Sequence, residues 1–137
     1  MKKYVLELDK DQARVVAEAL EFSSRFSAGQ FMHWPNSFEN FLWKTKPETI
    51  DLNTQLRAVE AAFRNFKVAV MRLHPNESLG IGSPDLIEEA KIAYDIYRPI
   101  LEAFAKDLPD DTWTTYKEPG LSYSKKGRVD VKIEDKG

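Results

Sequence analysis

The sequence predicts an α+β fold with an N-terminal strand, three long helices that include an antiparallel helix pair, and a C-terminal β-hairpin. Two observations predict this class: side chains alternate in character near both ends of the chain, and apolar residues recur at helical spacing between them. The length of 137 residues suits one domain. We therefore expect a single domain over residues 1–137, with residues 134–137 frayed.

The first predicted elements are a strand and a helix. Residues 3–8 alternate between apolar side chains on one side and mixed ones on the other, which is typical of a half-buried strand. Asp9 and Gln12 have the spacing of a capping box, which opens a helix. An apolar stripe follows, and Gly29 is a suitable residue for the end of this helix.

A second long helix is predicted to begin near Asp51 and to end at His74-Pro75-Asn76. A short helix over residues 36–43 precedes it. The apolar residues of the long helix are spaced alternately by four and three positions, as in a heptad seam. They are Leu52, Leu56, Val59, Phe63, Phe66, Val70 and Leu73.

The third long helix is predicted to start with Ser83 as its N-cap and Pro84 as its first residue, and to run to Leu108 with Pro99 inside it. Its apolar residues also follow a heptad seam, so we expect it to pair antiparallel with the second helix. A second apolar set widens the stripe beyond what one partner helix covers. This surplus is expected either in the centre of the core or at a subunit interface, and we favour a homo-oligomer.

The last predicted element is a hairpin. Residues 121–123 and 128–133 read as two strands around a turn at Lys126-Gly127.

Composition excludes several classes of function. The absence of cysteine excludes a disulfide framework and a thiolate nucleophile, and the two histidines are too far apart for a metal motif. The net charge of -2 lacks the basic excess of a DNA or RNA binder. No apolar stretch is long enough for a membrane span or a secretory signal, which predicts a cytoplasmic protein. We also expect the protein to need no cofactor.

The segment Gly80-Ile81-Gly82-Ser83-Pro84 is the first candidate site. It places Gly80, Gly82 and Ser83 at a predicted helix N-terminus, where free amides favour an anion such as phosphate. The alternative is an ordinary loop followed by an ordinary cap. The segment lacks the Gly-Lys-Ser/Thr of a P-loop and the third glycine of a dinucleotide fingerprint.

The end of the first helix is the second candidate. Arg25 suits a phosphate, and an aromatic ring can stack on a nucleobase. The alternative places the aromatics in the core and Arg25 in a surface ion pair. On the third helix, Lys91 is a further candidate cation and Tyr94 a further stacking ring, although tyrosines at this spacing usually belong to the core. The remaining candidates of the segment are Gln30, Phe31, His33 and Trp34.

Two stretches of the chain resemble a family of small, largely uncharacterised phage and prophage proteins. The resemblance covers residues 4–34, with Ser24-Arg25 and Gly29-Gln30-Phe31, and residues 73–105, with the segment from Pro75 to Pro84. It implies a phage accessory protein in the cytoplasm of an infected or lysogenic bacterial host. One class of such proteins, the anti-defence sponges, binds nucleotide second messengers of bacterial immunity and withholds them from effectors.

The sequence and the resemblance together predict a non-enzymatic phage anti-defence protein that sequesters a small phosphate-bearing nucleotide without cleaving it. A cyclic dinucleotide or a cyclic ADP-ribose-like molecule is the expected ligand. Two alternatives stay open: a phage inhibitor that binds a host or defence protein directly, and a phosphodiesterase of the nucleotide signal.

Overall fold

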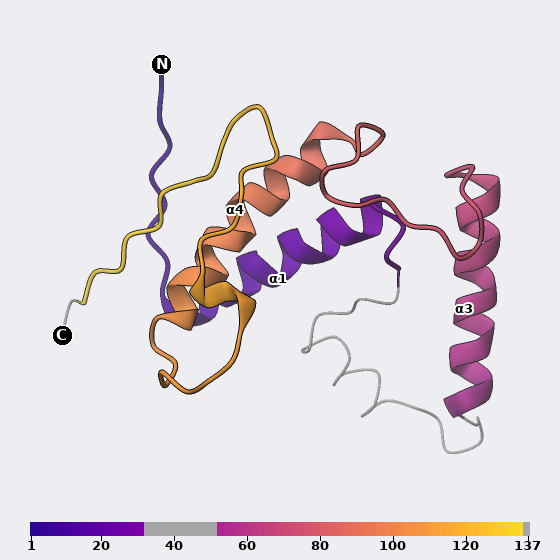
Figure 1. Cartoon of the computed structure of the whole chain (residues 1–137), viewed down its shortest axis with the longest axis horizontal. Coiled ribbons are helices and arrows are strands. Elements are labelled where there is room, and N and C mark those ends of the chain that lie inside the picture. The colour runs from indigo at the N-terminus through magenta and orange to yellow at the C-terminus, as the bar shows by residue number, and fades with distance from the viewer. Residues whose placement is uncertain (32–51, 136–137) are drawn as a thin grey trace.

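The structure, a computed structural model, describes residues 1–31 and 52–135, and it is helical throughout its regular elements (Figure 1). The helices are α1 (Lys10–Ser27), α3 (Leu52–Ala69) and α4 (Glu88–Ala105), followed by a single 3-10 turn, η1 (Thr115–Lys117). No strand forms among the described residues, so the predicted α+β class is wrong. The predicted helix at 36–43 lies outside the described residues.

Helix α1 begins and ends as predicted. The Gln12 backbone N–H donates to the Asp9 carboxylate at 2.8 Å, and the Asp9 N–H donates to the Gln12 side chain at 3.0 Å. This capping box satisfies amides that the first helical turn cannot pair. Gly29 follows the helix at φ 82°, a left-handed conformation that glycine adopts without steric cost.

The antiparallel pair of the structure consists of α1 and α4 (Figure 1). The buried Ser24 hydroxyl donates to the Ala90 carbonyl at 2.9 Å, while Ala17 packs beside Tyr97 and Ile100 nearer the other end. The small side chains along this contact let the two helices approach closely. The predicted pairing of the second and third helices is therefore wrong, because α4 uses its apolar stripe on α1.

Helix α3 stands apart from this pair and is joined to it by aromatic side chains (Figure 1). The Phe31 ring lies 5.0 Å from the Phe63 ring and 5.4 Å from the Phe66 ring, measured between centroids, and 4.8 Å from Phe26 of α1. We call these four residues the aromatic cluster. Its offset and edge-on contacts are the geometry that aromatic pairs favour.

Helix α4 is shorter than predicted at both ends. Ser83 does not cap it, because the Ser83 hydroxyl accepts from the Asp85 N–H at 3.2 Å inside a separate turn. The helix begins instead after Ile87, whose side chain makes no capping hydrogen bond. Pro99 lies inside α4, as predicted. The helix ends at Ala105 rather than Leu108.

Neither terminal segment forms a strand. The predicted turn at Lys126-Gly127 is present, with Gly127 at φ 77° and its N–H donating to the Ser124 carbonyl at 3.3 Å. The chain on either side does not pair with itself, because the segment before the turn lies along α4. Residues 1–9 run as an extended, exposed chain with no neighbouring strand (Figure 1), so the predicted half-buried strand over residues 3–8 is wrong.

Candidate functional site

One face of α4 carries three carboxylates at intervals of seven residues, and we call Glu88, Asp95 and Glu102 the carboxylate ladder. Each accepts a hydrogen bond from a backbone N–H of residues 120–125, in reverse order along the chain. A heptad spacing places all three on one side of the helix. The C-terminal segment is thus held antiparallel to α4 by side chains rather than by a sheet.

Asp95 is the central member and is 1% exposed. It accepts from the Ser124 N–H at 2.8 Å, the Ser124 hydroxyl at 2.6 Å, the Ser122 hydroxyl at 3.1 Å and the Tyr123 N–H at 3.1 Å. Burial by itself raises the pKa of this carboxyl, but the hydrogen bonds from Ser124, Tyr123 and Ser122 outweigh it and hold the pKa below its ordinary value. A buried charge with this many donors is satisfied in place.

Glu102 anchors the start of the same segment. It accepts from Arg128 at 2.7 Å and from the Gly120 N–H at 3.4 Å, while Arg128 also donates to the Gly120 carbonyl at 2.6 Å. The hydrogen bond from Arg128 to Glu102 raises the pKa of the guanidinium. Arg98 lies 3.4 Å from Glu102 and places its guanidinium 4.4 Å from the centre of the Tyr116 ring.

The two candidate segments meet at one point in the fold. The Leu79 N–H donates to the Ala28 carbonyl at 2.8 Å, and the Gln30 amide donates to the Leu79 carbonyl at 3.5 Å. Arg25 is held close by, donating to Gln30 at 2.7 Å and to Glu21 at 3.2 Å. The end of α1 and the loop before α4 are therefore joined by backbone and amide hydrogen bonds.

An open groove of about 620 Å³ lies between this junction and α3. Phe31 and Phe63 supply aromatic walls, and the Lys67 ammonium lies 5.6 Å from the centre of the Phe31 ring. Arg64 donates to Asn76 across the groove at 2.6 Å. The described residues that line it are Gly29, Gln30, Phe31, Glu60, Phe63, Arg64, Lys67, Pro75, Asn76 and Ser78. We call it the α3 groove.

The α3 groove contains two predicted site residues and several that the sequence reasoning missed. Gln30 and Phe31 line it, whereas Arg64, Lys67 and Asn76 were not predicted. The two cations lie on α3 between the positions of its apolar seam, where charged residues normally face solvent. Arg64 and Lys67 differ from other exposed cations only in lying near Phe31 in the fold. No local pattern in the sequence predicts that position.

The other predicted site residues lie elsewhere. Gly80 and Gly82 are exposed in the loop before α4, and the ring of Tyr123 approaches Gly82. Lys91 is half-buried on α4, and Tyr94 makes edge-on contacts with Tyr97 and Tyr123, at 5.2 and 5.3 Å between centroids. His33 and Trp34 lie outside the described residues. The fold thus does not bring the whole predicted set to one pocket.

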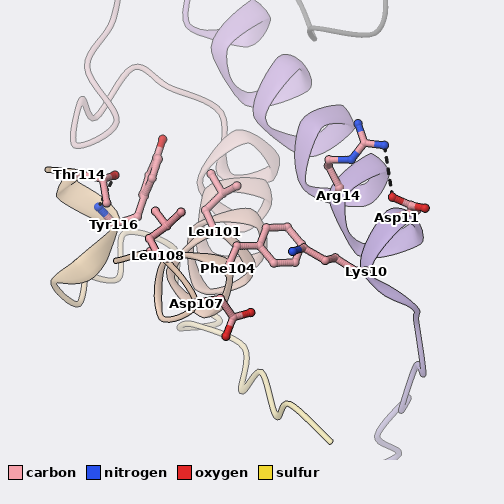
Figure 2. A pocket seen from close by; sticks show the side chains of 10 residues that line it. Lys10, Asp11, Arg14, Leu101, Phe104, Asp107, Leu108, Thr114 and Tyr116 are labelled. Atoms are coloured by element: carbon pink, nitrogen blue, oxygen red, sulfur yellow. Dashed lines mark hydrogen bonds and ion pairs between the residues drawn. The ribbon is translucent and has the colours of Figure 1, made fainter. Parts of the chain in front are cut away.

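A second hollow, of about 340 Å³, lies where α1 begins and α4 ends (Figure 2). Leu101, Phe104 and Leu108 form its apolar side, and Arg14 on its rim faces Asp11 at 3.6 Å (Figure 2). Arg14 also lies 3.8 Å from Glu18. The lining balances two cations, Lys10 and Arg14, against two acids, Asp11 and Asp107, so this hollow offers an anion less than the α3 groove does.

The described residues contain neither a candidate metal site nor a candidate membrane span. No group of three or more His, Cys, Asp or Glu side chains in residues 1–31 and 52–135 is placed to hold a metal ion. No helix in that same part of the chain is both long and apolar enough to cross a membrane.

Comparison with known proteins adds no relative. A scan against protein-family models, a search of curated proteins and a search of solved structures each returned no match to this chain.

Proposed function

We propose that the protein binds a small phosphate-bearing nucleotide in the α3 groove and sequesters it without chemical change, as a phage anti-defence sponge. The observation that supports this is the lining of the groove, which combines aromatic rings, two cations and amide or hydroxyl groups. Its volume of about 620 Å³ falls within the range of small-molecule sites, about 300–1000 Å³. The sponge role itself rests on the resemblance to phage proteins.

The chemistry of the groove matches the parts of a nucleotide. Arg64 and Lys67 outnumber the single acid, Glu60, so the lining carries a net positive charge that suits a phosphate. Phe31 is only 4% exposed and stacks on Phe63 at 5.0 Å, so this pair of rings shapes the apolar wall of the groove. The Asn76 and Gln30 amides are the kind of group that hydrogen-bonds a base edge. Arg25 supports Gln30 from behind at 2.7 Å.

Calorimetric titration with cyclic di-AMP, cyclic di-GMP, cyclic GMP-AMP and cyclic ADP-ribose tests the proposal. We expect heat and a raised Tm with at least one of them. R64A and K67A should each weaken that binding about 10- to 100-fold, because each removes a charge-assisted contact to phosphate. K91A is the matched control, since Lys91 is a cation outside the groove.

The outcome that contradicts the proposal is an absence of both heat and Tm shift with every ligand of the panel. An equal loss of binding in K91A and K67A would also contradict the assignment to this groove. Nucleotide recovered unchanged after the complex is denatured distinguishes a sponge from a phosphodiesterase.

The direct inhibition of a host or defence protein is a second candidate, favoured by apolar side chains exposed on α3. Leu56 and Phe66 are each 38% exposed, and Val70, just beyond the helix, is 61% exposed; at helical spacing the three fall on one side of α3. Exposed apolar side chains grouped in this way are typical of protein-binding surfaces. V70D should abolish a stoichiometric complex with such a protein while leaving nucleotide binding unchanged, because Val70 does not line the groove.

A further inference from the structure

The two terminal segments share a pattern that the isolated chain does not use. Residues 3–8 and residues 128–133 are both extended, and in both the apolar side chains alternate with mainly polar ones. Tyr4 is 94% exposed, Leu6 is 73% exposed and Ile133 is 62% exposed. Extended segments with an apolar face are the elements that pair as strands when a partner is present.

The direction of the two segments limits how one chain can pair them. Figure 1 shows residues 3–8 descending the view toward α1, and residues 128–135 descending it toward the C-terminus. In this view the segments run in the same sense, so pairing them within one chain in these directions would be parallel. A second copy related by a two-fold axis that runs perpendicular to these segments presents its N-terminal segment in the opposite sense.

One antiparallel register matches the apolar faces of both segments throughout. Apolar residues then lie directly opposite one another at three successive positions, which is the arrangement that stabilises a strand pair. The pairs are Tyr4 with Ile133, Leu6 with Val131, and Leu8 with Val129.

Charges at the ends of the segments favour this antiparallel register over the parallel one. In the antiparallel register Lys3 faces Glu134 and Asp9 faces Arg128, so both ends carry opposite charges. The parallel register with the same apolar match places Lys3 opposite Arg128 and Asp9 opposite Glu134, which are like charges. The antiparallel register has one disadvantage, which lies in the middle of the pair. There it places Glu7 opposite Asp130, two like charges that the parallel register keeps apart.

The backbone of the C-terminal segment is oriented for this pairing. The Val129 N–H donates to the Asp95 carbonyl at 3.1 Å, so the polar edge of residue 129 faces α4. In an extended chain the N–H groups of Asp130 and Lys132 then face the opposite way, toward an added strand. The apolar pairs consequently fall at positions without mutual backbone hydrogen bonds, where side chains lie closest.

We propose that the protein forms a two-fold homodimer in which residues 4–8 of each copy pair antiparallel with residues 129–133 of the other. The pairing brings the apolar side chains of both segments against one another and supplies the strands that one chain lacks. It does not depend on the α3 groove, so a failure of nucleotide binding leaves it untouched.

Cysteine cross-linking tests the register, because the natural chain contains no cysteine. L6C and V131C are placed on separate chains, co-expressed, purified and mildly oxidised. We expect a covalent dimer containing one chain of each kind. Replacing V131C by D130C is the matched control, since neighbouring residues of a strand point to opposite faces, and it should give little cross-link.

Three results would overturn the proposal. The first is a disulfide within a single chain when L6C and V131C are combined in it. The second is equal cross-linking of D130C and V131C. The third is a native mass of 15.8 kDa in sedimentation velocity at about 100 µM protein, where we expect twice that mass. L6D should weaken dimerisation about tenfold or more, because it places a charge in the apolar face.

Discussion

The Asp95 carboxylate accepts hydrogen bonds from both the backbone N–H and the hydroxyl of Ser124, at 2.8 and 2.6 Å. This contact joins the middle of α4 to a residue 29 positions later in the chain. It holds the C-terminal segment against the helix, and Tyr123 and Ser122 add further donors to the same carboxylate. The C-terminal segment thereby covers the side of α4 that carries the carboxylate ladder.

Replacement of Asp95 by Asn should destabilise the protein by about 2–3 kcal/mol, because N–H and O–H donors then lose a buried charged acceptor. Urea unfolding followed by circular dichroism measures this change. Limited trypsin digestion should also cleave faster at Lys125 and Lys126 once the segment is released. D130N is the control, since Asp130 is exposed; equal effects of the two substitutions would refute the role of Asp95.

The stability of the protein should fall at acid pH partly through Asp95. Its native pKa lies below the ordinary value of 3.8, so the folded state holds this proton more weakly than the unfolded state does. The contribution of Asp95 is fully present above pH 3.8 and is lost as the pH falls through 3.8 toward the native pKa. The difference in unfolding free energy between the natural protein and D95N should shrink from pH 6 to pH 2.5; a constant difference would contradict this.

Replacement of Glu102 by Gln should cost about 1–2 kcal/mol, since it removes the charged partner of Arg128 and of the half-buried Arg98. E88Q is the matched control at the other end of the carboxylate ladder. Within the described part of the chain Glu88 accepts from the exposed Lys125 N–H, so its loss should cost less than about 1 kcal/mol. Thermal unfolding compares the Tm values of the two variants. A larger loss of stability in E88Q than in E102Q would contradict the stronger contribution of Glu102.

Gly120 should not tolerate a side chain, although its φ is not left-handed. A Cβ there would lie 3.0 Å from the Arg98 Nε and 3.2 Å from an Arg128 nitrogen, both of which are held in place by Glu102. We expect G120A to destabilise the protein by about 1 kcal/mol. At Gly80 a Cβ meets nothing within 4 Å, so G80A should be neutral in the same denaturation assay.

The candidate groove was only partly predictable from the sequence. Gln30 and Phe31 were predicted because they follow a helix end in an aromatic segment, which is a local pattern. Arg64 and Lys67 belong to α3, and the heptad seam of this helix predicts only which side of it is buried. Their position beside Phe31 follows from the aromatic cluster, a contact between residues more than 30 positions apart in sequence.

The sequence by itself determined the features that depend on neighbouring residues. The capping box of Asp9 and Gln12, the end of α1 near Gly29 and the turn at Gly127 all appear as predicted, because each is satisfied within a few residues. A heptad seam likewise showed that α4 needs a partner.

The tertiary structure alone decided which partner that was and where the extended segments went. Apolar periodicity specifies a buried face but not what covers it, so the choice of α1 over α3 depended on the close packing of small residues of α1, with Ala17 beside Tyr97 and Ile100 and Ser24 bonded to the Ala90 carbonyl. Alternation over residues 128–133 indicated an extended chain but not its hydrogen-bond partners. The carboxylates of α4 supplied acceptors for residues 120–125, and a hairpin that the sequence permits did not form in the single chain.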